Sequence, residues 1–122
     1  MVTHREGGLL AWQYRNYAER HVDKPNLWVH LYTVAAFIAS AAAAFAHLLS
    51  LQWFGVLVSL GVMAAALGLQ ALVGRREALS APPFDGPVDA LRQVFAEQFI
   101  TFPRFVLSGG WMRNVTRRPE HY

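Results

Sequence analysis

The sequence contains no cysteine, and it has no charged residue between Pro25 and Gly74. Without cysteine, the chain can form neither a disulfide framework nor a metal site built on thiolates. All 11 Lys and Arg residues and all 8 Asp and Glu residues lie outside this stretch, and 54% of the chain is hydrophobic. Because a soluble domain of this length carries charge along most of its helices, the composition predicts a membrane protein.

The uncharged stretch divides into two apolar runs, residues 26–49 and 53–73. About twenty apolar residues in a helix cross the hydrocarbon core of a bilayer, so each run is long enough for one crossing. The alternative, a soluble two-helix core, requires a polar stripe on each helix, and neither run shows one. The sequence therefore predicts a single all-α membrane domain, residues 1–122, built around a transmembrane helix hairpin.

The basic residues predict how this hairpin is oriented. Four of them precede the first apolar run and seven follow the second, whereas the connection at residues 50–52 has none. Since Lys and Arg accumulate on the cytoplasmic side, both termini are expected in the cytoplasm. The net charge of +3 is dispersed around apolar segments. This distribution indicates contact with a lipid surface and no nucleic-acid partner.

Two amphipathic segments flank the hairpin. Residues 8–22 place apolar and charged side chains on different helical faces, which predicts a helix lying on the membrane surface. Residues 87–108 repeat apolar side chains every three or four positions, with a kink expected at Pro103. Residues 111–122 are expected to form a basic, polar tail. The side chains predicted to contact the interface or a partner are Trp12, Phe95, Phe99, Phe102 and Trp111.

Small residues recur along both apolar runs at the spacing that lets helices approach closely in lipid. They form more rows than one hairpin needs for its internal contact, which indicates further packing against other integral membrane subunits. The predicted helix-packing residues are Ala35, Ala36, Ala39, Ser40 and Ala43 in the first run and Gly55, Ser59, Gly61, Ala65 and Gly68 in the second.

Candidate metal ligands gather where the first run begins. His21 and His30 flank Asn26, and neutral imidazole is a common ligand of transition metals. Histidines also serve as amphipathic anchors at membrane interfaces, so the spacing alone leaves both roles open. His47 lies 17 residues beyond His30, about 25 Å along a helix, and is expected at the opposite membrane face.

The two histidines belong to the longer pattern Tyr17-x3-His21-x4-Asn26-x3-His30. This pattern resembles the N-terminal motif of the small membrane proteins typified by the fungal endoplasmic-reticulum 2-hydroxy fatty acid dioxygenase. The resemblance implies a protein of similar length that uses ferrous iron to shorten 2-hydroxy fatty acids by one carbon.

The second motif of that family, Gln-x-x-Gly-His followed by Glu and a proline-containing stretch, is only partly present. Gln70, Glu77 and the prolines at 82–83 match it, and residues 102–111 are similar to a bacterial branch of the family. Residues 73–74, however, are Val-Gly where the family has Gly-His, so one implied ligand is absent. The ligand set left for Fe(II) in this reading is His21, His30, Glu77, Gln70 and Asn26.

Two functions are therefore predicted. The first is a non-catalytic accessory subunit of a larger membrane complex, respiratory or photosynthetic, that needs no cofactor. The missing histidine and the surplus of small-residue rows favour it. The alternative is an Fe(II)-dependent lipid oxygenase similar to the 2-hydroxy fatty acid dioxygenase.

Overall fold

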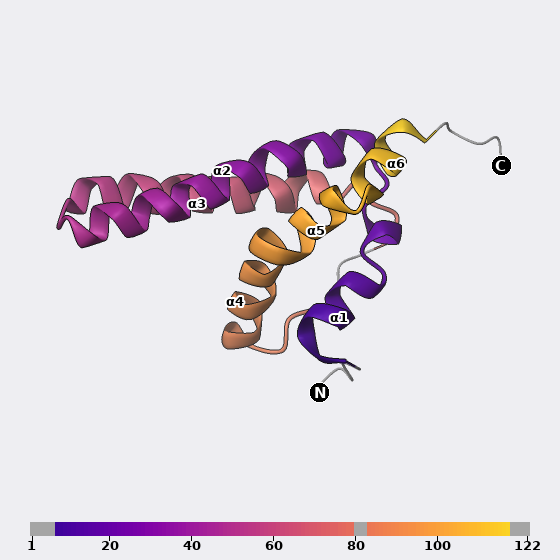
Figure 1. Ribbon diagram of the computed structural model, residues 1–122, viewed down its shortest axis with the longest axis horizontal. Coiled ribbons are helices and arrows are strands. Elements are labelled where there is room, and N and C mark those ends of the chain that lie inside the picture. Colours follow the sequence, from indigo (N-terminus) through magenta and orange to yellow (C-terminus); the bar gives the residue numbers. More distant parts are fainter. Residues whose placement is uncertain (1–6, 80–82, 118–122) are drawn as a thin grey trace.

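The computed structural model describes residues 7–79 and 83–117, and every regular element within these ranges is a helix (Figure 1). The two longest helices, α2 and α3, are long and apolar enough to cross a membrane by length and composition. In chain order the elements are α1 (Gly8–Arg15), the 3-10 helix η1 (Ala18–Arg20), α2 (Lys24–Leu49), α3 (Trp53–Gly74), α4 (Pro87–Ala96), the π-helix η2 (Glu97–Thr101), α5 (Phe102–Leu107) and α6 (Gly110–Thr116).

Helices α2 and α3 run antiparallel, side by side, and a three-residue turn joins them (Figure 1). The Gln52 amide donates to the His47 carbonyl across 2.8 Å, and the two side chains also bond at 2.7 Å. Leu51 has a positive φ of 57°, the left-handed conformation that such a tight reversal requires. The connection is therefore stabilised by its own hydrogen bonds, and it contains no charged residue.

The far ends of the same two helices are fastened to each other. Asp23 caps α2 by accepting the Asn26 amide at 3.1 Å, and Pro25 occupies the first turn, where a missing N–H costs nothing. Arg76, just after α3, donates to the Asp23 carboxylate at 2.8 Å. This cap explains why α2 begins at Lys24, two residues before the predicted run.

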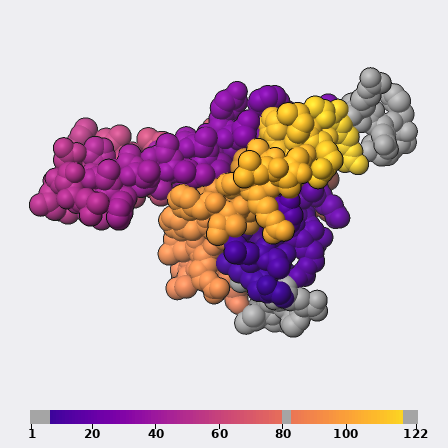
Figure 2. Space-filling model, in the orientation of Figure 1, coloured from indigo at the N-terminus to yellow at the C-terminus, as the bar shows by residue number. Residues whose placement is uncertain are grey.

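The shorter helices cover only one half of the α2–α3 pair. Helices α1 and α4 to α6 gather around the end where α2 begins and α3 finishes, and the end with the turn projects beyond them as a narrow arm (Figures 1 and 2). All buried residues of α2 lie between Asn26 and Phe37. We call residues 40–62 the tip and the rest of the described chain the base.

An aromatic and aliphatic core holds the base together. Its buried members are Tyr17, Leu27, Val34, Phe102, Phe105 and Trp111. The sequence placed Phe102 and Trp111 at an interface and residues 111–122 in a tail, but α6 brings Trp111 inward, and its Nε1–H donates to the Leu27 carbonyl at 2.9 Å. Residues 118–122 of that tail lie outside the described part of the chain.

Glycines allow α6 to fold back. Gly109 has φ of 87°, a left-handed turn that glycine adopts readily. Gly110 then packs on Phe105 so closely that an added Cβ would lie 2.6 Å from the aromatic ring. At residues 108–110, after the long amphipathic segment, the chain therefore reverses direction and returns to the core.

The two amphipathic segments are less regular than the sequence predicts. Residues 8–22 form α1, a turn and η1, not one helix. Residues 87–108 form α4, η2 and α5 in succession, and the change to π geometry precedes Pro103. Proline has no N–H to bond the carbonyl four residues back, and the Phe102 amide instead reaches the Glu97 carbonyl five residues back.

Candidate functional site

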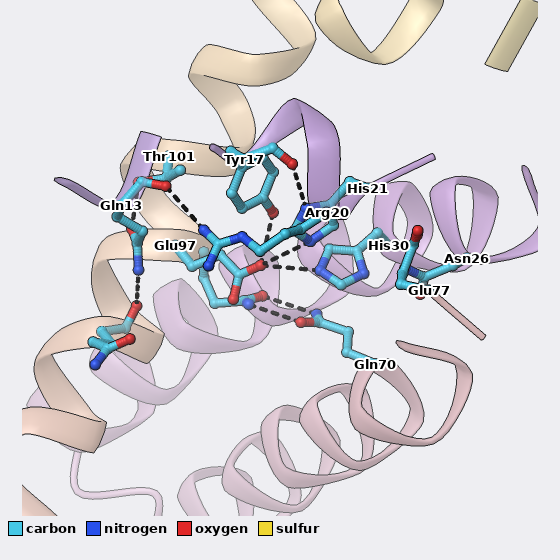
Figure 3. A network of polar contacts seen from close by, with 12 residues as sticks. Gln13, Tyr17, Arg20, His21, Asn26, His30, Gln70, Glu77, Glu97 and Thr101 are labelled. Atoms are coloured by element: carbon cyan, nitrogen blue, oxygen red, sulfur yellow. Dashed lines mark hydrogen bonds and ion pairs between the residues drawn. The ribbon is translucent and has the colours of Figure 1, made fainter. Parts of the chain in front are cut away.

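The fold brings His21, His30 and Glu97 together from three elements at the base (Figure 3). One ligand atom from each lies within 4.8 Å of the other two. Glu97 Oε2 is 3.1 Å from His30 Nε2 and 3.7 Å from His21 Nε2. Metal bonds of about 2.1 Å place neighbouring ligand atoms about 3 Å apart, so these separations suit a shared ion. Two histidines and one carboxylate form the donor set.

His21 is oriented by the turn that precedes α2. Its Nδ1–H donates a hydrogen bond to the Tyr17 carbonyl at 2.8 Å, and its ring stacks on the Tyr17 ring at 3.8 Å. This hydrogen bond fixes the tautomer, because a proton on Nδ1 leaves the lone pair of neutral imidazole on Nε2. The His21 lone pair therefore faces the Glu97 carboxylate, an arrangement that a cation between them would stabilise.

Tyr17 also orients the carboxylate. Its hydroxyl donates to Glu97 Oε2 at 2.7 Å, and its side chain is fully buried. Outer-shell hydrogen bonds of this kind hold metal ligands in place in known sites. The first residue of the sequence pattern thus contacts both His21 and Glu97.

The environment keeps His21 neutral and Glu97 ionised at neutral pH. Burial and the electrostatic interaction with His30 lower the pKa of His21 to about 4. Burial alone raises the pKa of Glu97, but the hydrogen bond and electrostatic interaction with His30, the interaction with His21 and the hydrogen bond from Tyr17 outweigh it and lower that pKa to about 2. Burial and Glu97 raise the pKa of Tyr17, which stays protonated.

A cavity of about 680 Å³ adjoins the three residues. Its lining includes the polar side chains of Gln13, Tyr17 and Arg20 and the apolar side chains of Leu67, Ala71, Leu79, Phe84 and Val94. This volume is in the range of sites for small ligands, about 300 to 1,000 Å³. Three buried side-chain atoms without hydrogen-bond partners belong to residues that line it: Arg20 Nε, Asn26 Oδ1 and His30 Nδ1.

Glu77, the carboxylate expected from the sequence, lies elsewhere. It accepts the Val22 and Asp23 amides at 2.9 and 3.1 Å and the Asn26 Nδ2 at 2.7 Å. The arginine beside it, Arg76, pairs with Asp23. Glu77 therefore joins the N-terminal end of α2 to the C-terminal end of α3 and is not part of the three-residue cluster.

Gln70 and Asn26 line the same cavity. Gln70 and Gln98 exchange two amide hydrogen bonds of 2.9 and 2.8 Å, both buried, which tie α3 to η2. This exchange anchors the π-helix that carries Glu97. π-Helical turns inside helices often mark functional sites.

Glu97 is the site residue that reading the sequence missed. In the amphipathic segment 87–108 it lies off the apolar face, with Gln93 about one turn and Asp89 about two turns earlier. Both of these are buried, however, and Gln13 donates to the Gln93 carbonyl at 2.9 Å. A signal existed in the composition: the polar residues closest to Glu97, Gln93, Gln98 and Thr101, are uncharged, as suits a face turned to protein.

Comparison of the chain with protein-family models, with curated proteins and with solved structures gave no match. The geometry of the site and the sequence pattern are therefore the evidence for its function. A cluster of two imidazoles and one carboxylate leaves metal positions open, and both Fe(II) oxygenases and catalytic zinc sites use such a set.

Proposed function

We propose that this chain is an Fe(II)-dependent oxygenase that acts on a lipid close to its polar end, with His21, His30 and Glu97 as the iron ligands. The observation that carries the proposal is the convergence of these three side chains beside a cavity whose lining includes several apolar side chains. The similarity of the Tyr17 to His30 pattern to the 2-hydroxy fatty acid dioxygenases favours iron over zinc. In this proposal Glu97 takes the place of the family's missing histidine.

The proposal includes a position in the membrane. We infer that α2 and α3 form a transmembrane hairpin in a bacterial inner membrane with both chain ends in the cytoplasm. Counting along α2, His30 then lies about 9 Å below Lys24, at the depth where a lipid headgroup meets its chain. A cysteine introduced at Thr116 should resist an impermeant thiol reagent outside intact cells, whereas one at Ser50 should react.

Each residue has a defined task in this proposal. Ferrous iron supplies the capacity to activate oxygen. Binding it through His30 Nε2 requires the ring proton on Nδ1, an atom that is buried and has no hydrogen-bond partner in the described part of the chain. Tyr17 holds Glu97, and the apolar side chains that line the cavity exclude water from the lipid chain.

The direct test is oxidation of a defined lipid. Purified protein loaded anaerobically with Fe(II) should convert a 2-hydroxy fatty acid to the acid shorter by one carbon when oxygen is admitted. His30→Ala should abolish the conversion, and Arg92→Gln, an exposed substitution on α4, should leave it intact. Bound zinc with no oxidation would contradict the iron proposal and indicate a hydrolase.

A second candidate, the accessory subunit, is favoured by the open small-residue faces. Ala35, Ala39 and Ala65 are exposed, and at Gly61 and Gly68 an added Cβ meets nothing within 4 Å. By contrast, Ser59 is buried and Gly55 packs on the His47 ring, while Ala36, Ser40 and Ala43 are half-buried. The open faces suit close packing against another membrane helix.

The other expected contact residues add little free surface to this candidate. Phe95 and Phe99 stack on each other and pack on Phe37, although both remain about 40% exposed, and Trp12 is half-buried. Ala39→Leu or Gly61→Leu should keep normal membrane levels and reduce recovery with a larger complex extracted in mild detergent. A lone monomer, unaffected by either substitution, would exclude the subunit role.

A further inference from the structure

Arg20 has few partners in the described part of the chain. There its guanidinium makes one hydrogen bond, from Nη2 to the Gln13 carbonyl at 3.3 Å, and its Nε is buried with no partner. Within residues 7–79 and 83–117, no carboxylate lies at ion-pair distance from it. Unpaired donors of a charged group are costly to bury, so the position is explained best by a partner that arrives from outside the chain.

The cavity gives Arg20 access to such a partner. Arg20 lines it together with His21, His30 and Glu97, and Figure 3 shows the guanidinium extending across the same space as Tyr17 and Glu97. A second cation, Arg75, lines the cavity as an exposed residue at the end of α3. The carboxylates of Glu77 and Glu97 are already engaged by the hydrogen bonds described above.

The cavity lining also includes apolar side chains. Leu67 and Ala71 lie on α3 at helical spacing, and Leu79, Phe84 and Val94 line the same cavity. Leu79 and Phe84 are themselves half or more exposed, so part of this apolar lining reaches the surface of the base. A ligand that matches both the cations and the apolar lining has an anionic head and a hydrocarbon chain.

We propose that Arg20 binds the anionic headgroup of a single-chain amphiphile whose chain lies against α3. The guanidinium fork pairs equally with carboxylate and with phosphate, so the shared chemistry is a planar or tetrahedral oxyanion on one chain. This inference rests on the proposed function only in placing the first chain carbons beside the metal ligands. It adds a specificity-determining residue that acts by holding the head and touches no metal.

The test uses photoactivatable probes on metal-free protein in nanodiscs of zwitterionic lipid. A fatty acid and the matching fatty alcohol, each with a diazirine in mid-chain, are irradiated with the protein, and labelled peptides are located by mass spectrometry. The acid should label the α3 segment around Leu67 and Ala71 at least about tenfold more than the alcohol, the effect of one charge-assisted hydrogen bond. An alkyl phosphate competitor identifies which oxyanion is preferred.

Substitutions separate headgroup binding from general damage. Arg20→Gln should abolish the preference for the acid, Arg20→Lys should retain part of it through charge alone, and the exposed control Arg92→Gln should leave it unchanged. Equal labelling by acid and alcohol in the unsubstituted protein, or a preference that survives Arg20→Gln, would overturn the inference.

The two proposals fail differently. Because labelling is measured without iron, a protein that binds no iron but prefers the acid through Arg20 keeps the headgroup site and loses the oxygenase. A protein that binds iron at His21, His30 and Glu97 but shows no preference that depends on Arg20 keeps the oxygenase and loses the headgroup site.

Discussion

The tip and the base bury different kinds of atoms, although α2 and α3 run through both. In the tip the largest apolar side chains face outward; Phe54 is 81% and Leu49 70% exposed. In the base, buried glutamines, Asn26, His30 and Thr101 are held by side chains from distant segments. The tip therefore exposes apolar side chains that suit an apolar environment, and the base depends on contacts within the protein. Substitutions matched between the two regions can separate these contributions.

The largest effect on stability is expected in the aromatic core of the base. Phe102→Ala removes a side chain that is 1% exposed and should lower the free energy of unfolding by about 3 to 5 kcal/mol. The matched tip substitution, Phe54→Ala, opens no internal cavity and should change it by less than about 1 kcal/mol. Unfolding titrations in mixed micelles measure both. Equal losses would mean that the tip is as packed as the base.

A buried amide pair gives the next effect. Gln70→Leu leaves the Gln98 amide buried without its two hydrogen bonds and should cost about 1 to 3 kcal/mol. Adding Gln98→Leu removes the stranded group, so the double variant should recover much of the loss. A double-mutant cycle that shows simple additivity would mean that the two glutamines are not partners.

The tip has its own close contact, at the turn. At Gly55 an added Cβ would lie 2.5 Å from the His47 ring, so Gly55→Ala should force that ring away from Gln52 and cost about 1 kcal/mol or more. Gly61→Ala, where nothing lies within 4 Å, is the control and should be neutral. If His47→Ala fails to rescue Gly55→Ala, the contact is not the cause.

The smallest effect is expected at the surface pair that joins the ends of α2 and α3. Arg76 is more than half exposed, and removing its bond to Asp23 by Arg76→Ala should change stability by less than about 1 kcal/mol. The change should shrink further at high salt, because exposed charges are screened. A loss of several kcal/mol would show that this junction, and not the core, holds the base closed.

The same division explains what the sequence could predict. The tip and the two long helices followed from composition and length, and His21 and His30 came from a local pattern. Glu97 lies 67 residues from His30 in the chain, and a π-helix and the Gln70–Gln98 pair position it. No local periodicity encodes those contacts. For the same reason Trp111, in a basic tail by composition, was not recognised as a core residue.

The carboxylate that completes the cluster is the central claim, and iron content tests it most directly. Wild-type protein, Glu97→Gln and Glu77→Gln are purified under anaerobic conditions, loaded with Fe(II), passed through a desalting column and analysed for metal. We expect about one iron per chain in the wild type and in Glu77→Gln, because the Glu77 carboxylate only joins the N-terminal end of α2 to the end of α3. Glu97→Gln should retain less than about a tenth of that amount, since a lost ligand costs more than the 10- to 100-fold of an outer-shell change. Retention of iron by Glu97→Gln, or its loss in Glu77→Gln with the fold intact, would contradict the assignment.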